Sequence, residues 1–210
     1  MAVPDSLPQR MFLLAYDPDK GRIRAGGNTG AVLRAAALAD LYLSGHLADE
    51  RGRVAVVGVR RPCPDPVLAA VLDEVAGARP RKWHTWVGRR QRAAVGAVRQ
   101  QLGDGGWVRL EPHRILGLFP TVRVTVRDPR VRKELVSRVT GALSSPVGRV
   151  EPADAALVAL VAAGDLHGVL DRRTKRAHKQ RIRELTERSG PAGPALRKSI
   201  RDAAASGGAG

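Results

Sequence analysis

Apolar residues recur along most of the chain at the three- to four-residue spacing of an amphipathic helix. Between residues 31 and 44 this spacing predicts a helix that follows a cap at Asn28 or Thr29 and ends at Gly45. Further helices are predicted over 67–77, over 84–102, after Pro129 and over 171–188, with a short final helix beyond 194. The segment 153–163 is apolar on every side, so the helix that it forms is expected to be buried.

Two segments show strand-like patterns around central turns. They are HLADERGRVAVVGV (46–59), with its turn at 50–52, and GDGGWVRLEPHRILGLFPTVRVTV (103–126). Each predicted hairpin follows a helix and a glycine-containing turn, which suggests two weakly similar helix–hairpin units. The earlier segment MFLLAYDPDKGRI (11–23) is predicted to be a strand or buried segment, broken by a turn at Asp17, Pro18 and Gly21.

Together these elements predict a mainly α fold, in which a compact helical domain carries two β-hairpins and its helix–hairpin units pack around the buried apolar helix. The predicted organisation is a polar N-terminal lead (1–9), a single domain (10–203) and a disordered tail (204–210). Hydrophobic residues make up 43% of the 210 residues and charged residues 27%, which is typical of folded rather than disordered proteins.

The charge balance adds a functional constraint. The chain has 36 Lys and Arg residues and only 20 Asp and Glu residues, which gives a formal net charge of +16. A field of that sign favours polyanions, either nucleic acid or the anionic surface of a membrane. Arginine far outnumbers lysine, and alanine, valine and glycine are abundant. This pattern suggests a GC-rich bacterial genome, which lowers the weight of the charge as a sign of function.

Cysteine content and hydropathy indicate the compartment. Cys63 is the only cysteine, so an intramolecular disulfide is impossible and a reducing compartment is expected. The longest apolar run, AALVALVAAG (155–164), is about half of the ~20 residues that a spanning helix needs, and MFLLAY (11–16) lacks the features of a secretory signal. We therefore expect a cytoplasmic protein that is soluble or peripheral on the inner face of the membrane.

Motifs for catalysis are absent. The five histidines are scattered, a single cysteine excludes a thiolate zinc site, and no nucleophile-elbow, zincin or P-loop motif occurs. Asp73 and Glu74 in LDEV form an acid pair of the kind that usually lies solvated on a helix surface. AGGNTG (25–30) precedes a helix and offers backbone N–H groups for a phosphate, although a loop that needs glycine only to turn is the simpler interpretation. We expect no enzymatic activity, no metal and no cofactor.

Several stretches, taken in order, resemble the Golgi phosphoprotein 3 family. They are VLRAAALADLYLSGHLADERGRVAVV (32–57), PCPDPVLAAVLDEV (62–75), GGWVRLEPHRILGLFPTVRVTVRDPRVRKEL (105–135) and AALVALVAAGDLHGVL (155–170) followed by a basic helix. The resemblance covers roughly residues 10–200. It implies a compact, mostly helical protein without catalytic activity, similar to eukaryotic members that bind phosphatidylinositol 4-phosphate on Golgi membranes and retain glycosyltransferases there.

The resemblance also implies a headgroup site. Arg34 matches the family's first pocket arginine, and Arg92 is the best match to a second one, before the second hairpin. Two positions depart from the family: Ala25 stands where the pocket tryptophan is expected, and Val95 stands where a further arginine is expected. In the alternative interpretation Arg34 projects to solvent or pairs with a nearby acid.

The segment RKWHTWVGRRQR (81–92) suits an anionic membrane interface, because tryptophan prefers the headgroup level and arginines are attracted to anionic lipid. Arg89 and Arg90 join Arg92 as predicted headgroup ligands, and Trp83 is a predicted membrane contact. Core packing is the alternative for Trp83 and is favoured for Trp86.

The second hairpin supplies the other predicted membrane contacts. They are Leu116, Leu118 and Phe119 in RILGLFPTV (114–122), which resembles an apolar hairpin that family members use for lipid insertion or oligomer contacts. The same segment therefore also predicts a homo-oligomer contact.

Two other functions remain open from the sequence. A winged-helix-like nucleic-acid-binding protein is disfavoured, because the helix over 31–44 carries only Arg34 and Asp40 as charges and lacks a base-reading face. An adaptor that recruits client proteins is the third possibility. We favour a non-enzymatic peripheral protein that binds a phosphoinositide, such as phosphatidylinositol 4-phosphate, or another anionic lipid headgroup.

Overall fold

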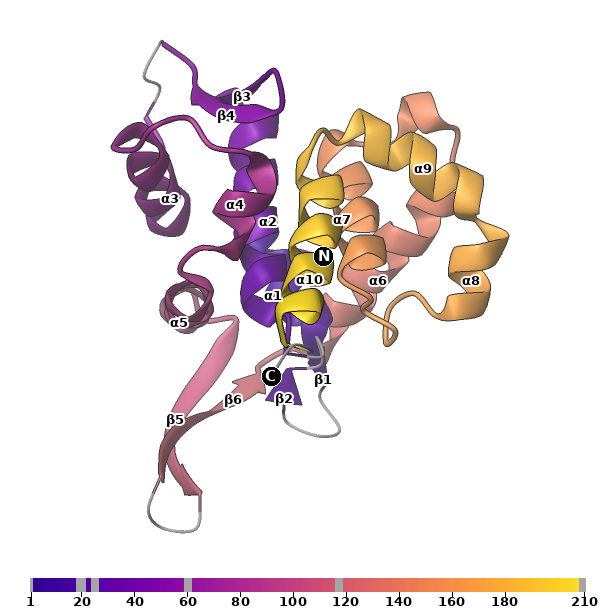
Figure 1. Cartoon of the computed structure of the whole chain (residues 1–210). Coiled ribbons are helices and arrows are strands. Elements are labelled where there is room, and N and C mark those ends of the chain that lie inside the picture. Colours follow the sequence, from indigo (N-terminus) through magenta and orange to yellow (C-terminus); the bar gives the residue numbers. More distant parts are fainter. Residues whose placement is uncertain (1, 18–21, 24–26, 59–61, 116–118, 208–210) are drawn as a thin grey trace.

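The computed structural model describes the chain except for residues 1, 18–21, 24–26, 59–61, 116–118 and 208–210 (Figure 1). The described helices are α1 (Leu7–Ala15), α2 (Thr29–Leu43), α3 (Pro66–Ala76), α4 (Trp83–Gly88), α5 (Gln91–Asp104), α6 (Pro129–Ser144), the 3-10 turn η1 (Val147–Arg149), α7 (Pro152–Ala163), α8 (Arg172–Ala177), α9 (Lys179–Arg188) and α10 (Ala192–Gly207). The described strands are β1 (Tyr16–Asp17), β2 (Arg22–Ile23), β3 (Leu47–Glu50), β4 (Arg53–Val56), β5 (Val108–Ile115) and β6 (Phe119–Val126). The predicted mainly α fold is confirmed.

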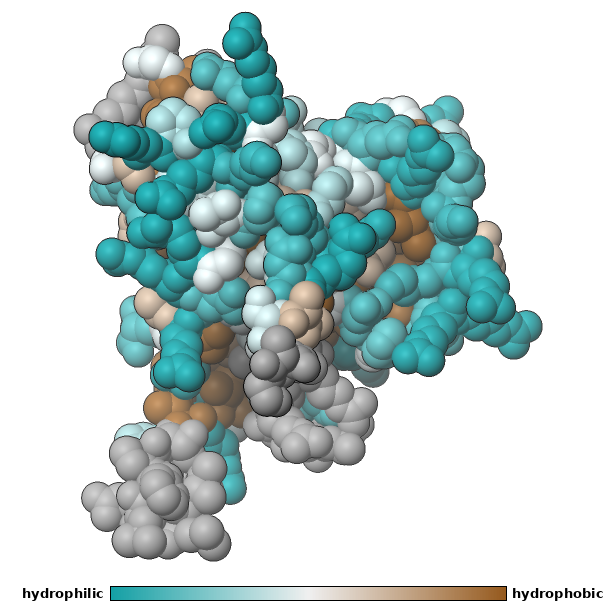
Figure 2. Space-filling view, in the orientation of Figure 1, coloured by the Kyte–Doolittle hydropathy of each residue, from teal (hydrophilic) through white to brown (hydrophobic). Residues whose placement is uncertain are grey.

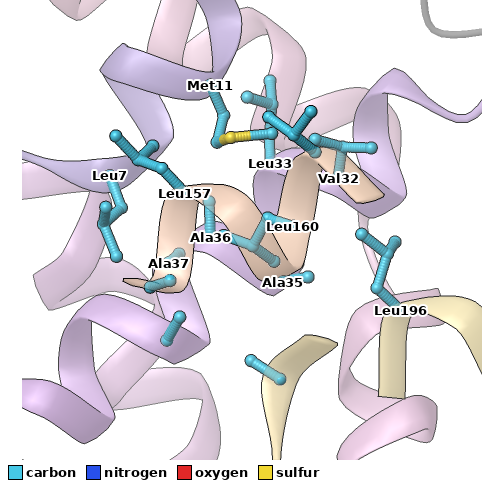
Figure 3. Close-up of a cluster of buried hydrophobic side chains, with 14 of the residues drawn as sticks. Leu7, Met11, Val32, Leu33, Ala35, Ala36, Ala37, Leu157, Leu160 and Leu196 are labelled. Atoms are coloured by element: carbon cyan, nitrogen blue, oxygen red, sulfur yellow. The ribbon is translucent and has the colours of Figure 1, made fainter. Parts of the chain in front are cut away.

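The core is built around α2 and α7, which are buried along almost their whole length. Both helices are rich in alanine and aliphatic residues and lack a polar face, so neighbouring helices pack on all sides of them. α1 packs on α2, and α10 packs on both α2 and α7 (Figure 1). Figure 3 shows the resulting cluster, in which Met11 of α1 lies beside Leu33 of α2 near Leu157 of α7. α7 confirms the predicted buried helix.

Two helix–hairpin units are present, as the repeated pattern suggested. α2 leads into the antiparallel pair β3–β4, and α5 leads into β5–β6. In each unit a glycine in the left-handed region stands two residues after the helix end, with φ of 73° at Gly45 and 72° at Gly106. The amide after this glycine donates a hydrogen bond back to a carbonyl of the helix. His46 donates to Leu41 at 2.8 Å after α2, and Trp107 donates to Leu102 at 2.9 Å after α5. The two units therefore share one type of helix C-cap.

The hairpins differ in length and placement. β3 and β4 meet at Arg51 and Gly52, both with positive φ, which confirms the predicted turn. β5 and β6 are eight residues each, and they project from the helical body (Figure 1). In the same view β3–β4 lies at the top and β5–β6 at the bottom, so the two hairpins are at opposite ends of the molecule.

The N-terminal segment differs from its prediction. Residues 11–15 form the second half of α1 rather than a strand, and only Tyr16 and Asp17 are extended, paired with Arg22 and Ile23. The apolar run has no two-residue alternation, and it is buried on nearly every side, which a helix in the core accommodates. α1 also begins within the predicted polar lead, because Leu7 starts the helix and is buried. The predicted turn residues Pro18 and Gly21 lie outside the described residues.

Two predicted helices are each divided in two. The region 84–102 forms α4 and α5, separated at Arg89 and Arg90, and the region 171–188 forms α8 and α9, separated at His178. Other boundaries agree with the sequence: Asp65 caps α3, and Asp128 caps α6, where Pro129 occupies the first turn.

The C-terminal helix is longer than predicted. α10 continues to Gly207, so the residues 204–207 that were assigned to a disordered tail are helical, and 208–210 lie outside the described residues. Buried Leu196 packs this helix into the core, and its polar side is exposed. The face seen in Figure 2 is covered mainly by hydrophilic residues, in agreement with the high content of charged residues.

Candidate functional site

A cavity of about 560 Å³, which we call the trough, lies between α2, α3 and α5. Most of its wall is small and apolar, with contributions from Leu33, Ala37, Pro66, Val67, Ala70, Val71, Ala93, Ala94 and Ala97. Its polar lining residues include Arg34, Glu74 and Arg90, and also Gln9, Gln100, Gln101 and Asp104. The trough is therefore an apolar site with few polar groups, a composition typical of ligand pockets.

Two contacts fix the direction of the trough. Gln101, near the end of α5, donates from Nε2 to Oδ2 of Asp65 at 2.7 Å, and Asp65 caps the start of α3. Glu74, in the last turn of α3, accepts a hydrogen bond from Arg89, just before α5 begins. α3 and α5 are thus antiparallel, and the trough has a charged end at Glu74 and an amide end at Gln101.

Arg34 is buried at the charged end. It lies in the second turn of α2 and is only 3% exposed. Its Nη1 is 3.1 Å from Oε2 of Glu74, and its Nε and Nη2 both donate to the Trp86 carbonyl at 3.3 Å. Burial lowers the pKa of Arg34, and the charge of Glu74 opposes that shift. Because arginine stays protonated in proteins, this end carries a permanent buried cation.

Glu74 connects three arginines. Besides Arg34, its carboxylate contacts Arg89 at 3.1 Å and Arg90 at 3.9 Å, measured from each Nε to Oε1. We call Arg34, Arg89 and Arg90 the arginine cluster. Three guanidinium groups around one carboxylate leave a local excess of two positive charges. An anion that reaches this end would add hydrogen bonds to donors that one carboxylate does not saturate.

The break between α4 and α5 positions the two outer arginines. Arg90 has φ of 46°, a left-handed conformation that is unfavourable for a residue with a side chain, and it directly precedes α5. Arg89 lies over the ring of Trp86, with its Cζ 5.4 Å from the ring centroid. Their side chains are 40% and 70% exposed, respectively, so both are open to a ligand from solvent.

The structure brings three of the four predicted headgroup residues together. Arg34, Arg89 and Arg90 meet at Glu74, whereas Arg92 is exposed on α5 and is not part of the trough lining. Arg34 pairs with an acid, as the alternative interpretation allowed. Val95, at the family's further arginine position, packs against the core.

The predicted membrane contact at Trp83 requires a correction. Trp83 is buried, its indole Nε1 donates to Oδ1 of Asp49 at 2.7 Å, and its ring meets Tyr42 edge to face at 5.8 Å. These partners hold the indole inside the protein, so it offers no surface to lipid in this conformation. Trp86 is fully buried, which confirms the favoured interpretation of that residue.

The hairpin contacts stay a prediction. Leu116 and Leu118 lie outside the described residues, and Phe119 begins β6, where the position of its side chain is not described. The homo-oligomer contact through 114–122 and the client proteins are likewise untested predictions.

The sequence interpretation missed Glu74, which it placed on a solvated surface. Its side chain is only 12% exposed. Glu74 follows Val71 by three residues and Val67 by seven, so it continues the buried stripe of α3. This spacing is the signal that distinguishes it from its neighbour Asp73, which is exposed.

Within the described ranges, no group of three or more His, Cys, Asp or Glu residues has the arrangement of a metal site. None of the helices formed by the described residues combines the length and the apolar character that crossing a membrane requires.

Comparison with known proteins gives the family. No curated protein matches the chain significantly. The model of the family described as Golgi phosphoprotein 3 (GPP34) matches residues 7–203, nearly the whole chain. This range includes all three helices of the trough and the arginine cluster. The chain therefore belongs to the Golgi phosphoprotein 3 family, in agreement with the ordered motifs of its sequence.

Proposed function

We propose that this protein is a non-enzymatic peripheral membrane protein that binds an anionic lipid headgroup at the arginine cluster. The observation that carries the proposal is the meeting of Arg34, Arg89 and Arg90 around the single carboxylate of Glu74. The buried Arg34 fixes the position of the site, and the two exposed arginines provide the donors that a ligand meets first.

The chemistry of the site favours a phosphorylated headgroup. Guanidinium groups bind phosphate oxygens through paired, charge-assisted hydrogen bonds. Two arginines close to a membrane surface also gain about 1 kcal/mol each from the negative surface potential. A phosphoinositide such as phosphatidylinositol 4-phosphate supplies a phosphate monoester for the first effect, and any anionic lipid supplies the second.

Nucleic-acid binding is the rival function, and the architecture argues against it. The winged-helix interpretation requires a helix beside each hairpin to enter a major groove. α2 is buried between α1, α7 and α10, so it has no free face for such a contact. An adaptor role for client proteins is compatible with the lipid site and needs no different geometry.

Co-sedimentation with vesicles tests the proposal. Neutral phosphatidylcholine vesicles are compared with two anionic sets of equal total charge, one containing phosphatidylserine and one containing phosphatidylinositol 4-phosphate. Wild type should bind the anionic sets. Arg89→Ala/Arg90→Ala should bind at least about tenfold more weakly, because the loss of two surface arginines removes roughly 2 kcal/mol.

The matched control is Arg172→Ala/Arg173→Ala, which removes two adjacent exposed arginines from the start of α8. This variant should lose clearly less affinity than the cluster variant. Equal losses would indicate a diffuse basic surface, and no binding of wild type to any vesicle would overturn the proposal. Arg92→Ala, measured separately, decides whether the site extends onto the exposed face of α5, as the resemblance implies.

A further inference from the structure

We propose that the trough binds the hydrocarbon chain of a single-chain anionic lipid, with the phosphate of that lipid at the arginine cluster. This inference rests on the proposed function, because it places the headgroup at the same arginines. It adds a site for the chain and a ligand class, the lysophospholipids and alkyl phosphates, which leave a lipid bilayer far more readily than two-chain lipids.

The walls of the trough suit a hydrocarbon chain. α5 presents Ala93, Ala94 and Ala97, and α3 faces them with Val67, Ala70 and Val71. Alanine side chains are short, so they leave open space between the two helices that larger side chains would fill. Ala70, Ala93 and Ala97 are exposed to solvent, and a hydrocarbon chain along this wall would remove them from water.

Charge complementarity places the phosphate at one end. The arginine cluster with Glu74 has an excess of two positive charges, and Arg34, Glu74 and Arg90 all line the trough. The apolar wall is therefore continuous with a phosphate-binding end, which is the order of groups in a single-chain anionic lipid.

Gln9 is an independent indication of a ligand. It belongs to α1, lines the trough and is only 8% exposed, yet its side-chain amide has no hydrogen-bond partner among the residues that the structure describes. The amide nitrogen and oxygen are not fully enclosed, so a ligand in the trough can reach them and form a hydrogen bond with them. The amide can donate to the ester carbonyl of an acyl glycerol phosphate, a group that a simple alkyl phosphate lacks.

The far end of the trough limits the length of the chain. Gln101 is held by Asp65 there, and its Oε1 is buried without a partner. Gln100 and Asp104, which pair with each other at 2.8 Å, also line this end. Along α3, the distance from residue 66 to residue 74 is about 12 Å at 1.5 Å per residue. A chain that extends beyond this length meets polar groups and gains no further apolar contact.

Isothermal titration calorimetry with the full chain tests the inference, using monooctyl, monodecyl and monododecyl phosphate below their micelle concentrations. Binding should be saturable with one site. Affinity should rise up to about fourfold for each added methylene, the increment for complete burial of a CH2 group, and then level off when the trough is full. Decyl glucoside, which has the chain without the charge, should bind at least tenfold more weakly than monodecyl phosphate.

Substitutions in the trough test where the hydrocarbon chain and the ester group of the ligand bind. Ala97→Phe fills the trough from α5 and should abolish the dependence on chain length, whereas Ala203→Phe, on the exposed side of α10, should retain it. Lauroyl lysophosphatidic acid should bind more tightly than monododecyl phosphate, and Gln9→Leu should remove that preference. An unchanged preference in Gln9→Leu would overturn the assignment of Gln9.

The inference and the proposed function fail separately. If wild type binds anionic vesicles but shows no saturable, chain-dependent binding of alkyl phosphates, the chain site is overturned and the headgroup site stands. If Ala97→Phe and Ala203→Phe bind the series equally well, the trough is not the chain site. Loss of vesicle binding by wild type would overturn the proposed function itself.

Discussion

At the residue scale, the structure gives Arg34 two roles that the sequence could not separate. A guanidinium group that is almost completely buried needs partners for its donors, and Glu74 and the Trp86 carbonyl supply them. The same group lines the trough beside Arg90. Arg34 therefore holds α2, α3 and α4 together and also contributes charge to the candidate lipid site.

Replacing Arg34 by methionine should destabilise the protein by about 2–4 kcal/mol, because Glu74 then keeps a desolvated charge with only the two outer arginines. Urea denaturation followed by tryptophan fluorescence measures this loss. The double variant Arg34→Met/Glu74→Leu should recover a large part of the lost stability, since it leaves no desolvated carboxylate without its buried partner. If the losses measured separately for Arg34→Met and Glu74→Leu simply add in the double variant, the pair is not coupled as the distances indicate.

The roles that could be predicted from the sequence depend on local motifs, whereas those that could not depend on contacts between residues far apart in the chain. Arg34 was predicted from a local family motif, and Trp86 from its packing pattern. The partner of Arg34 is 40 residues away on another helix, and the Asp49 partner of Trp83 is 34 residues away. The spacing of Glu74 on α3 indicates that it is buried, but sequence spacing does not indicate which distant residue pairs with it or with Trp83.

At the element scale, the repeated helix C-caps explain why α2 and α5 both turn sharply into hairpins. Gly45 and Gly106 adopt positive φ, which a side chain disfavours, and the next amide closes the helix end. These glycines were visible in the sequence, and so were the hairpins that follow them. The break at Arg90 was not, because the residue that adopts the left-handed conformation is an arginine, whereas Gly88, at the end of α4, does not have a positive φ.

A pair of glycine substitutions on the α5 unit tests this account. Gly106→Ala should destabilise the protein by about 1 kcal/mol through backbone strain alone, since a Cβ there meets no atom within 4 Å. Gly96→Ala, in the interior of α5 with equally open space, should stabilise it by up to about 1 kcal/mol. Thermal denaturation of both variants gives the comparison, and equal effects of the two substitutions would contradict the assigned cap.

At the scale of the whole molecule, both ends of the chain build one core. α1 and α10 pack against α2, and α7 joins the same cluster (Figures 1 and 3). The fold class followed from the sequence because the all-apolar segment of α7 must be buried. The arrangement of the helices around it did not, since nearly every face of α2 and α7 is apolar and no stripe indicates which neighbour packs where.

A core variant tests the cooperativity of this arrangement. Leu157 of α7 is fully buried, and Leu157→Ala should lower the unfolding free energy by about 2–5 kcal/mol by leaving a cavity. Circular dichroism and tryptophan fluorescence should still report one common transition, because the tryptophans of α4 and the helices of the core unfold together. Two separate transitions would show that the region of the trough unfolds independently of the core.

The left-handed backbone of Arg90 has an evolutionary consequence. Glycine and asparagine adopt this conformation at lower cost than arginine, and the position is exposed enough to tolerate either. A lineage selected only for folding would drift towards those residues at position 90. A lineage selected for the proposed ligand would keep arginine there, so the amino acid found at this one position would distinguish descendants that retain the proposed lipid site from those that have lost it.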